Sequence, residues 1–202
     1  MSAVLCGSGF LAWFAAVEAL TRRLCVGREL SRKFVHLTSG LAAAAMPLVL
    51  TFREIAVLGA LFAVAMAASR RLGILRSVHE VERATWGEVC LPLGVAAAAV
   101  LAPDAARYAC AVATIAVSDV AACLAGRRLG GRRLPWGGKT WAGSAAFFLT
   151  ALVVGLVLLP WRPGAVLAVA ILTTVVEAAA SRGLDNVAVP VAAATALAVM
   201  AG

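Results

Sequence analysis

The sequence predicts an all-α fold, that of a polytopic integral membrane protein with about eight (seven to eight) transmembrane helices. Its 202 residues are 63% hydrophobic and only 14% charged, and the mean hydropathy is +0.96. Soluble domains are roughly 45–50% apolar and about 25% charged. The composition therefore excludes a water-soluble enzyme, a disordered chain and a coiled coil. The length suits one domain, and we expect a single transmembrane domain over residues 1–202.

The membrane spans are predicted from apolar runs, since a span needs about 20 mostly apolar residues and roughly 17 can suffice. In chain order the predicted spans are 3–20, 35–51, 54–69, 88–103, 105–125, 143–160, 164–180 and 186–201. The first has no basic segment before it and is long enough to span. We interpret it as a retained helix and not as a cleaved signal peptide.

The basic residues gather in every second connection between these spans. Fifteen of the 18 Lys and Arg residues lie in the segments 21–34, 70–87, 126–142 and 181–185, and the others are Arg53, Arg107 and Arg162. Cytoplasmic loops carry an excess of Lys and Arg, so the basic connections are predicted in the cytoplasm and both termini on the other side. In a prokaryote this would be the plasma or inner membrane. The net charge of the chain is +8. We expect the basic residues to bind anionic membrane lipids and an anionic substrate, and not nucleic acid.

Burial of a polar side chain within a membrane costs free energy, so the polar side chains found there are candidates for a functional site. Six of them lie near the cytoplasmic ends of predicted spans: His36, Glu88, Asp119, Glu177, Asp185 and Asn186. Because they share one depth and lie beside the basic connections, the sequence predicts one site that faces the cytoplasm and takes an anionic substrate.

The strongest stretch of this site runs from Ser118 to Ser144. Asp119 precedes a loop that contains Gly126, Arg127, Arg128, Gly130, Lys139 and Thr140. Free backbone amides and cations are what phosphate oxygens need, and an aspartate is a hard oxygen ligand for Mg²⁺. A Walker A motif is excluded, because Arg133 stands where its first glycine belongs. The alternative is a basic cytoplasmic loop that uses glycines for its turns.

The segment 31–36 places cations and an imidazole together. Lys33 and His36 are three residues apart and therefore share a helical face. The alternative is a pair of snorkelling cations beside a histidine at a helix end. Glu88 opens the fourth span, where it either belongs to the site or pairs with a loop arginine for structural reasons.

Carboxylates also recur at the end of the seventh span. Glu177 and Asp185 would line one face if the helix continued between them. Together with Asp119 they could form a metal-binding nest.

Taken in order, these stretches resemble the CTP-dependent polyprenol kinases, a group that includes dolichol, phytol and farnesol kinases and the CTP-dependent diacylglycerol kinase and is related to phosphatidate cytidylyltransferase. The motifs that carry the resemblance are Arg32-Lys33-x-x-His36, Gly87-Glu88 with Pro92, Asp119 through Gly126-Arg127 and Gly130, Lys139-Thr140-Trp141-Ala-Gly143-Ser144, and Asp185-Asn186 with Pro190. The stretch 139–144 is most similar to the phytol kinase branch, since dolichol kinases and cytidylyltransferases usually carry Glu at the position of Ala142.

The resemblance implies transfer of the γ-phosphate of CTP to the hydroxyl of a membrane prenol, such as phytol, farnesol, geranylgeraniol or a polyprenol, which yields prenyl phosphate and CDP. It implies catalytic roles for Asp119, His36, Lys33 and Glu88, with His36 or Asp119 receiving the alcohol proton. It further implies nucleotide binding by Gly126, Arg127, Arg128, Gly130, Lys139, Thr140 and Asn186, and Mg²⁺ binding by Asp119, Asp185 and Glu177.

Two alternatives stay open at this point. A cytidylyltransferase would join phosphatidate to the α-phosphate of CTP and release pyrophosphate. A small membrane transporter would use the carboxylates as an ion path, but such a path needs polar residues at several depths and on both sides of the membrane.

Overall fold

The computed structural model describes residues 28–72, 86–135 and 138–201, together with residues 5, 7–10, 12–13 and 16–17. These residues form helices, with one isolated β-bridge between Arg133 and Thr140 and no β-strand, so the all-α prediction is confirmed. In chain order the structure has α2 (Arg28–Ala44), the short 3-10 helix η1 (Met46–Leu48), α3 (Phe52–Arg71), α5 (Gly87–Leu101), α6 (Ala105–Leu129), α7 (Trp141–Leu158), α8 (Pro163–Ala179) and α9 (Asp185–Val199). The first predicted span, 3–20, lies mostly outside the described residues.

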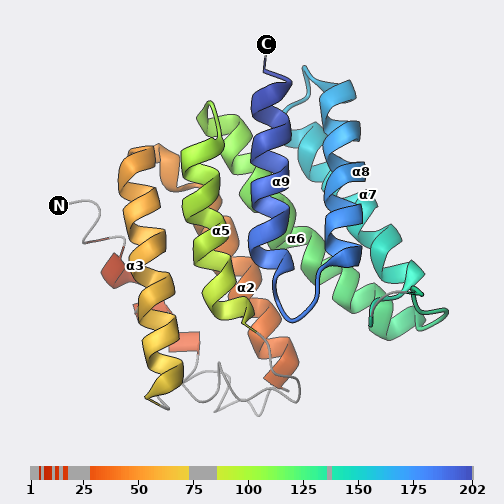
Figure 1. Cartoon of the computed structure of the whole chain (residues 1–202), viewed down its shortest axis with the longest axis horizontal. Coiled ribbons are helices and arrows are strands. Elements are labelled where there is room, and N and C mark those ends of the chain that lie inside the picture. The colour runs from red at the N-terminus through yellow and green to blue at the C-terminus, as the bar shows by residue number, and fades with distance from the viewer. Residues whose placement is uncertain are drawn as a thin grey trace.

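Consecutive long helices run in alternate directions (Figure 1). The central helix is α6, which packs against α2, α7 and α9, while α5 bridges α3 and α9, and α7 packs on α8. Tyr108, Val112 and Ile115 on α6 are completely buried in this core. One end of the bundle collects the beginnings of α2, α5, α7 and α9 and the ends of α3, α6 and α8. We call it the basic end, because it carries the arginine-rich connections.

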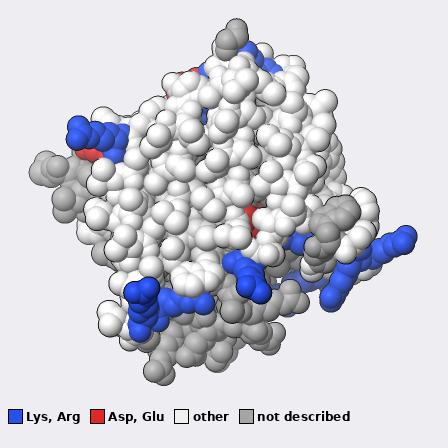
Figure 2. All heavy atoms as spheres, viewed as in Figure 1, with Lys and Arg blue, Asp and Glu red and all other residues white. Residues whose placement is uncertain are grey.

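Three helices, α3, α6 and α7, are long and apolar enough to cross a membrane, which indicates a membrane protein. The apolar helices α5, α8 and α9 are shorter, with 15, 17 and 15 residues. Large apolar side chains such as Val64, Val100 and Val157 stay exposed, as suits contact with lipid. Figure 2 shows a broad face that is almost free of charge, with Lys and Arg along its lower edge and smaller charged groups at the upper left and the top. The count of eight spans and their orientation stay predictions.

The predicted span 35–51 is wrong at both ends. α2 already includes Arg28 and ends at Ala44, and η1 follows with Pro47 inside it. Proline lacks the N–H that an α-helix needs and therefore ends the regular helix here. The polar residues of α2 belong to the helix because α6 packs against them. α6 likewise continues through Leu129, past the predicted end at residue 125, so the loop predicted at 126–142 is shorter than expected.

The opposite end of the bundle is built from tight, capped turns. Thr51 and Glu54 form a capping box at the start of α3, with the Thr51 N–H donating to Glu54 Oε2 at 2.8 Å. Asp104 caps α6 by accepting a hydrogen bond from the Arg107 N–H at 2.9 Å. The Arg162 guanidinium donates to the carbonyl oxygen of Met200 at 2.7 Å. The charged side chains of Glu54, Asp104 and Arg162 thus stabilise helix ends at this side of the bundle.

Glycine lets α2 approach α6 closely. A Cβ atom at Gly40 would lie only 2.5 Å from the Cβ of Ala116 on α6, which is far inside van der Waals contact. The contact between α2 and α6 therefore requires the missing side chain, because packed interiors have no room for an extra methyl group.

We predict that Gly40→Ala destabilises the bundle by about 1–3 kcal/mol, since it overpacks this contact. The measurement is the midpoint of thermal unfolding in detergent. Gly164→Ala is the control, because it makes the same change in a helix where a Cβ meets nothing within 4 Å. Equal midpoints for the two variants would contradict the close approach of α2 and α6.

Candidate functional site

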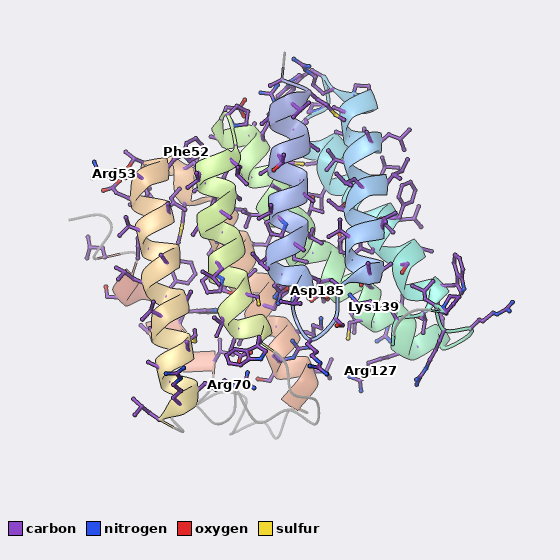
Figure 3. All side chains as sticks on the ribbon, viewed as in Figure 1. Phe52, Arg53, Arg70, Arg127, Lys139 and Asp185 are labelled. Carbon is purple, nitrogen blue, oxygen red and sulfur yellow. The ribbon has the colours of Figure 1, made fainter. Side chains whose placement is uncertain are left out.

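The residues predicted for the site come together at the basic end. Figure 3 shows Arg70, Arg127, Lys139 and Asp185 at this end, whereas Phe52 and Arg53 lie at the opposite end. The side chains come from helices that are distant in sequence, and the antiparallel arrangement brings their ends to one level. The prediction of a common depth for these residues therefore agrees with the structure.

Asp119 on α6 is held by two residues of α2. Lys33 Nζ lies 2.5 Å from Asp119 Oδ2, and His36 Nε2 lies 3.5 Å from the same oxygen and 3.3 Å from the carbonyl oxygen of Ile115. Lys33 and His36 are only 6% and 7% exposed. An isolated charge could not stay at such a position, so the opposite charges of Lys33 and Asp119 compensate each other.

A second lysine joins two further carboxylates. Lys139 Nζ donates to Glu177 Oε1 at 2.6 Å and to Asp185 Oδ2 at 2.8 Å, and Glu177 is only 2% exposed. Burial disfavours the Lys139 ammonium, but the carboxylates of Asp185 and Glu177 outweigh it and raise the pKa of Lys139 above its ordinary value. Lys139 therefore stays charged over the whole physiological range.

The two groups form one electrostatic unit. Asp119 interacts electrostatically with Lys139, and Glu177 with Asp119. We call the set of Lys33, His36, Asp119, Lys139, Glu177 and Asp185 the buried charge cluster. Its two lysines face three carboxylates, and it lies where α2, α6, α8, α9 and the loop before α7 meet.

Glu88 forms an ion pair with Arg70, which agrees with one of the two interpretations of the sequence. Arg70 Nη1 at the end of α3 donates to Glu88 Oε1 at 2.9 Å, and the Arg70 guanidinium lies 4.3 Å from the ring centre of Trp86. This contact ties α3 to the start of α5. A direct role of Glu88 in chemistry stays a prediction.

The loop between α6 and α7 is tight and open to its surroundings. Gly130 and Gly131 adopt positive φ angles of 58° and 92°, and a Cβ at either would meet nothing within 4 Å. The Leu134 N–H donates to the carbonyl oxygen of Lys139 at 2.9 Å, so the loop folds back on itself. Arg127 and Arg128 end α6 with exposed side chains. The exposed arginines and the open glycines lie on the side of the cluster that faces away from the bundle.

Gly126 and Thr140 have structural roles at the crossing of α6 and α7, and the role of Thr140 was not part of the sequence interpretation. Gly126 lies inside α6, and its Cβ would lie 2.9 Å from Thr140 Oγ1. Thr140 caps α7, because its hydroxyl accepts a hydrogen bond from the Gly143 N–H at 3.1 Å. Both residues therefore hold the crossing of α6 and α7. Their contact with a phosphate stays a prediction.

Four buried side-chain oxygens of the described residues have no hydrogen-bond partner: Ser118 Oγ, Ser144 Oγ, Glu177 Oε2 and Asn186 Oδ1. Glu177 lies near the end of α8 and Asn186 at the start of α9, both at the basic end. Ser118 directly precedes Asp119 on α6, and Ser144 lies in the first turn of α7. Buried polar atoms are normally hydrogen-bonded, and exceptions call for an explanation. All four atoms are enclosed by the surrounding side chains, so they are polar groups that the bundle itself leaves unpaired. Sequence reasoning missed Ser118 and Ser144 as candidates, because a serine in an Ala-rich helix gives no signal of its own.

The described residues do not contain a group of three His, Cys, Asp or Glu side chains that could hold a metal ion. The predicted nest of Asp119, Glu177 and Asp185 is not assembled, because lysines lie between the carboxylates. Mg²⁺ in nucleotide sites needs only one or two carboxylates and takes its other ligands from phosphates and water. Glu177 and Asp185 carry the oxygen donors that Mg²⁺ prefers, but Lys139 binds both of them here, and their binding of Mg²⁺ stays a prediction.

No protein-family model, curated protein or solved structure matches this chain. A functional proposal therefore depends on the chemistry of the site and on the sequence motifs.

We predict that Lys139→Met lowers stability by about 3–5 kcal/mol, because it leaves Glu177 and Asp185 buried without a countercharge. The triple variant Lys139→Met, Glu177→Gln and Asp185→Asn should recover much of this loss. Both are measured as thermal unfolding midpoints in detergent, with Arg53→Met at the opposite end as the control. A single variant as stable as this control would show that Lys139 does not hold the two carboxylates.

Proposed function

We propose that the protein is a lipid alcohol kinase that transfers the γ-phosphate of CTP to the hydroxyl of a membrane prenol. The observation that carries the proposal is the buried charge cluster at one end of an apolar bundle, directly beside an open loop with two exposed arginines. A reaction between a membrane lipid and a charged nucleotide needs such a boundary. The choice of CTP follows from the sequence resemblance.

His36 is the group that takes the proton from the alcohol. Its Nε2 lies near two acceptors, the Ile115 carbonyl oxygen at 3.3 Å and Asp119 Oδ2 at 3.5 Å, so this nitrogen carries the proton of the neutral ring. The other ring nitrogen, Nδ1, is then free to accept a proton. Asp119 orients the imidazole and stabilises its charged form, as a carboxylate does for a catalytic histidine in other enzymes.

The nucleotide phosphates bind on the loop side. An ammonium group has three donors, and Lys139 uses two of them for Glu177 and Asp185. The third donor is left for a phosphate oxygen. Arg127 and Arg128 add exposed positive charge, and the open backbone of Gly130 allows a phosphate to approach closely. Phosphoryl transfer depends mainly on such positioning and charge neutralisation.

The reaction balances without a further reactant. The alcohol oxygen forms a bond to the γ-phosphorus, the bond from that phosphorus to the bridging oxygen of the β-phosphate breaks, and the alcohol proton passes to His36 Nδ1. The products are prenyl phosphate and CDP. Mg²⁺ held by Glu177 and Asp185 would supply charge neutralisation on the nucleotide phosphates.

We predict that Asp119→Asn lowers the turnover rate at least about 100-fold, as expected for loss of a group that assists proton transfer. His36→Gln should have a similar effect while it leaves the pair of Lys33 and Asp119 intact. The assay uses purified protein in detergent with Mg²⁺, γ-labelled CTP or ATP, and farnesol, phytol, geranylgeraniol, undecaprenol or diacylglycerol. Asp104→Asn is the matched control, since it changes a carboxylate of the same helix at the opposite end and asparagine also caps helices well.

Product analysis separates the proposal from its rivals. Labelled lipid and CDP support the kinase, whereas pyrophosphate and a CDP-lipid formed from phosphatidate would identify a cytidylyltransferase. Wild-type rates for both Asp119→Asn and His36→Gln would remove the site from the mechanism. The absence of either reaction would leave transport as the function to test.

A further inference from the structure

The segment Gly-Arg-Arg-Leu occurs twice in succession, at residues 126–129 and 131–134. The first copy ends α6, and the second lies in the loop that leads to α7. Their leucines differ in exposure, since Leu129 is 74% exposed and Leu134 only 5%. The second copy is therefore anchored to the bundle by its leucine, while the first presents its leucine to the surroundings.

The second copy belongs to a closed hairpin. Arg133 forms a β-bridge with Thr140, and the Trp141 N–H donates to the Arg132 carbonyl oxygen at 3.2 Å. Arg132 and Trp141 thus lie opposite each other across the hairpin. We call residues 127–135 and 138–141 the arginine hairpin. It lies at one side of the basic end (Figure 1), so in a membrane it borders the surrounding lipid.

The arginine hairpin carries positive charge that the described chain does not neutralise. Arg127, Arg128, Arg132 and Arg133 are exposed, and within the part of the chain that the structure describes none of them forms an ion pair. The carboxylates described at the basic end are buried or half-buried, and each is already bound by a lysine or by Arg70. Figure 2 shows Lys and Arg side chains that project from this side of the molecule. The hairpin can therefore attract an anionic partner from outside the chain.

Exposed apolar side chains accompany these arginines. Trp141 is 55% exposed, and tryptophan is enriched at membrane–water interfaces because its ring is apolar while its N–H is polar. α6 also reaches this level. Its 25 residues correspond to about 37 Å, against roughly 30 Å for the hydrocarbon core of a bilayer. The last turn of α6, with Arg127, Arg128 and Leu129, can therefore lie among the lipid headgroups.

We propose that the arginine hairpin binds the headgroups of anionic phospholipids in the leaflet at the basic end, with Arg132 and Arg133 on the lipid phosphates and Trp141 in the interface. A guanidinium suits this role, because its planar fork binds two phosphate oxygens at once. The sequence alone predicts anionic lipids as partners of the basic residues in general, whereas the proposal concerns this one hairpin. It goes beyond the proposed function and does not depend on it.

Binding is tested without nucleotide, in nanodiscs that hold the full chain. The probe is phosphatidylglycerol with bromine atoms on its acyl chains, mixed into phosphatidylcholine, because bromine quenches tryptophan fluorescence only on close approach. The signal of Trp141 is the difference between the wild type and Trp141→Phe. We expect brominated phosphatidylglycerol to quench this signal more than brominated phosphatidylcholine does at the same mole fraction. The difference should shrink at high ionic strength, since salt screens exposed charges.

Two arginine variants test the charge. Arg132→Gln and Arg133→Gln should each weaken the preference for phosphatidylglycerol about fivefold, the usual contribution of one arginine near an anionic membrane. Both side chains are exposed, so the variants should fold as well as the wild type. Arg53→Gln is the matched control, because it removes an exposed arginine at the opposite end (Figure 3) and should leave the preference unchanged.

Four results would overturn the proposal. Equal quenching by the two brominated lipids would show that the hairpin does not select anionic headgroups, and no quenching by either would place Trp141 away from the bilayer. A preference that survives the combined loss of Arg132 and Arg133 would belong to other residues. Loss of the preference when CTP is added would give these arginines to the nucleotide and not to the lipid. None of these measurements requires kinase activity.

Discussion

The ion pair between Lys33 and Asp119 is the interaction on which the arrangement of the site depends. Lys33 is buried and Asp119 is half-buried in an apolar bundle, where an unpaired charge would be strongly destabilising. Because Lys33 lies on α2 and Asp119 on α6, the pair fixes how these two helices are rotated against each other. The same rotation turns His36 toward α6 and forms one wall of a cavity between α2, α3 and α5. A single electrostatic requirement therefore positions both the polar groups and the cavity.

Close packing of the helices makes this pairing possible. Gly40 has no Cβ atom, so α2 can approach Ala116 on α6. For the same reason Gly126 lets α6 approach Thr140 at the start of α7. In an apolar environment helices associate largely through such small residues, because lipid offers no hydrophobic drive between them. The glycines bring three helices within reach of short ionic contacts, and the buried charge cluster then holds them in register.

Much of this fold could be predicted from the sequence, since apolar runs and turn residues are local signals. The ends of α3, α5, α8 and α9 lie within a few residues of the predicted spans, and the common depth of the polar side chains was also expected. The partners were not predictable, because Lys33 and Asp119 are 86 residues apart and their contact depends on helix rotation. For the same reason Lys139 was assigned to phosphate alone, while the structure gives it two carboxylates. The helical face shared by Lys33 and His36 was expected, but the start of α2 at Arg28 was not, because the polar residues before position 35 give no apolar signal.

The site has two sides that suit chemically different partners. Arg127 and Arg128 are exposed at the end of α6, where the proposed nucleotide would bind, while the cavity beside α2 is lined largely by apolar side chains. His36 and Asp119 lie between these two sides. In the proposed reaction a phosphoryl group would pass between these two sides, since nucleotide phosphates are charged and a prenyl tail is apolar. The proposed reaction therefore assigns the transfer step to His36, which lines the apolar cavity and contacts Asp119.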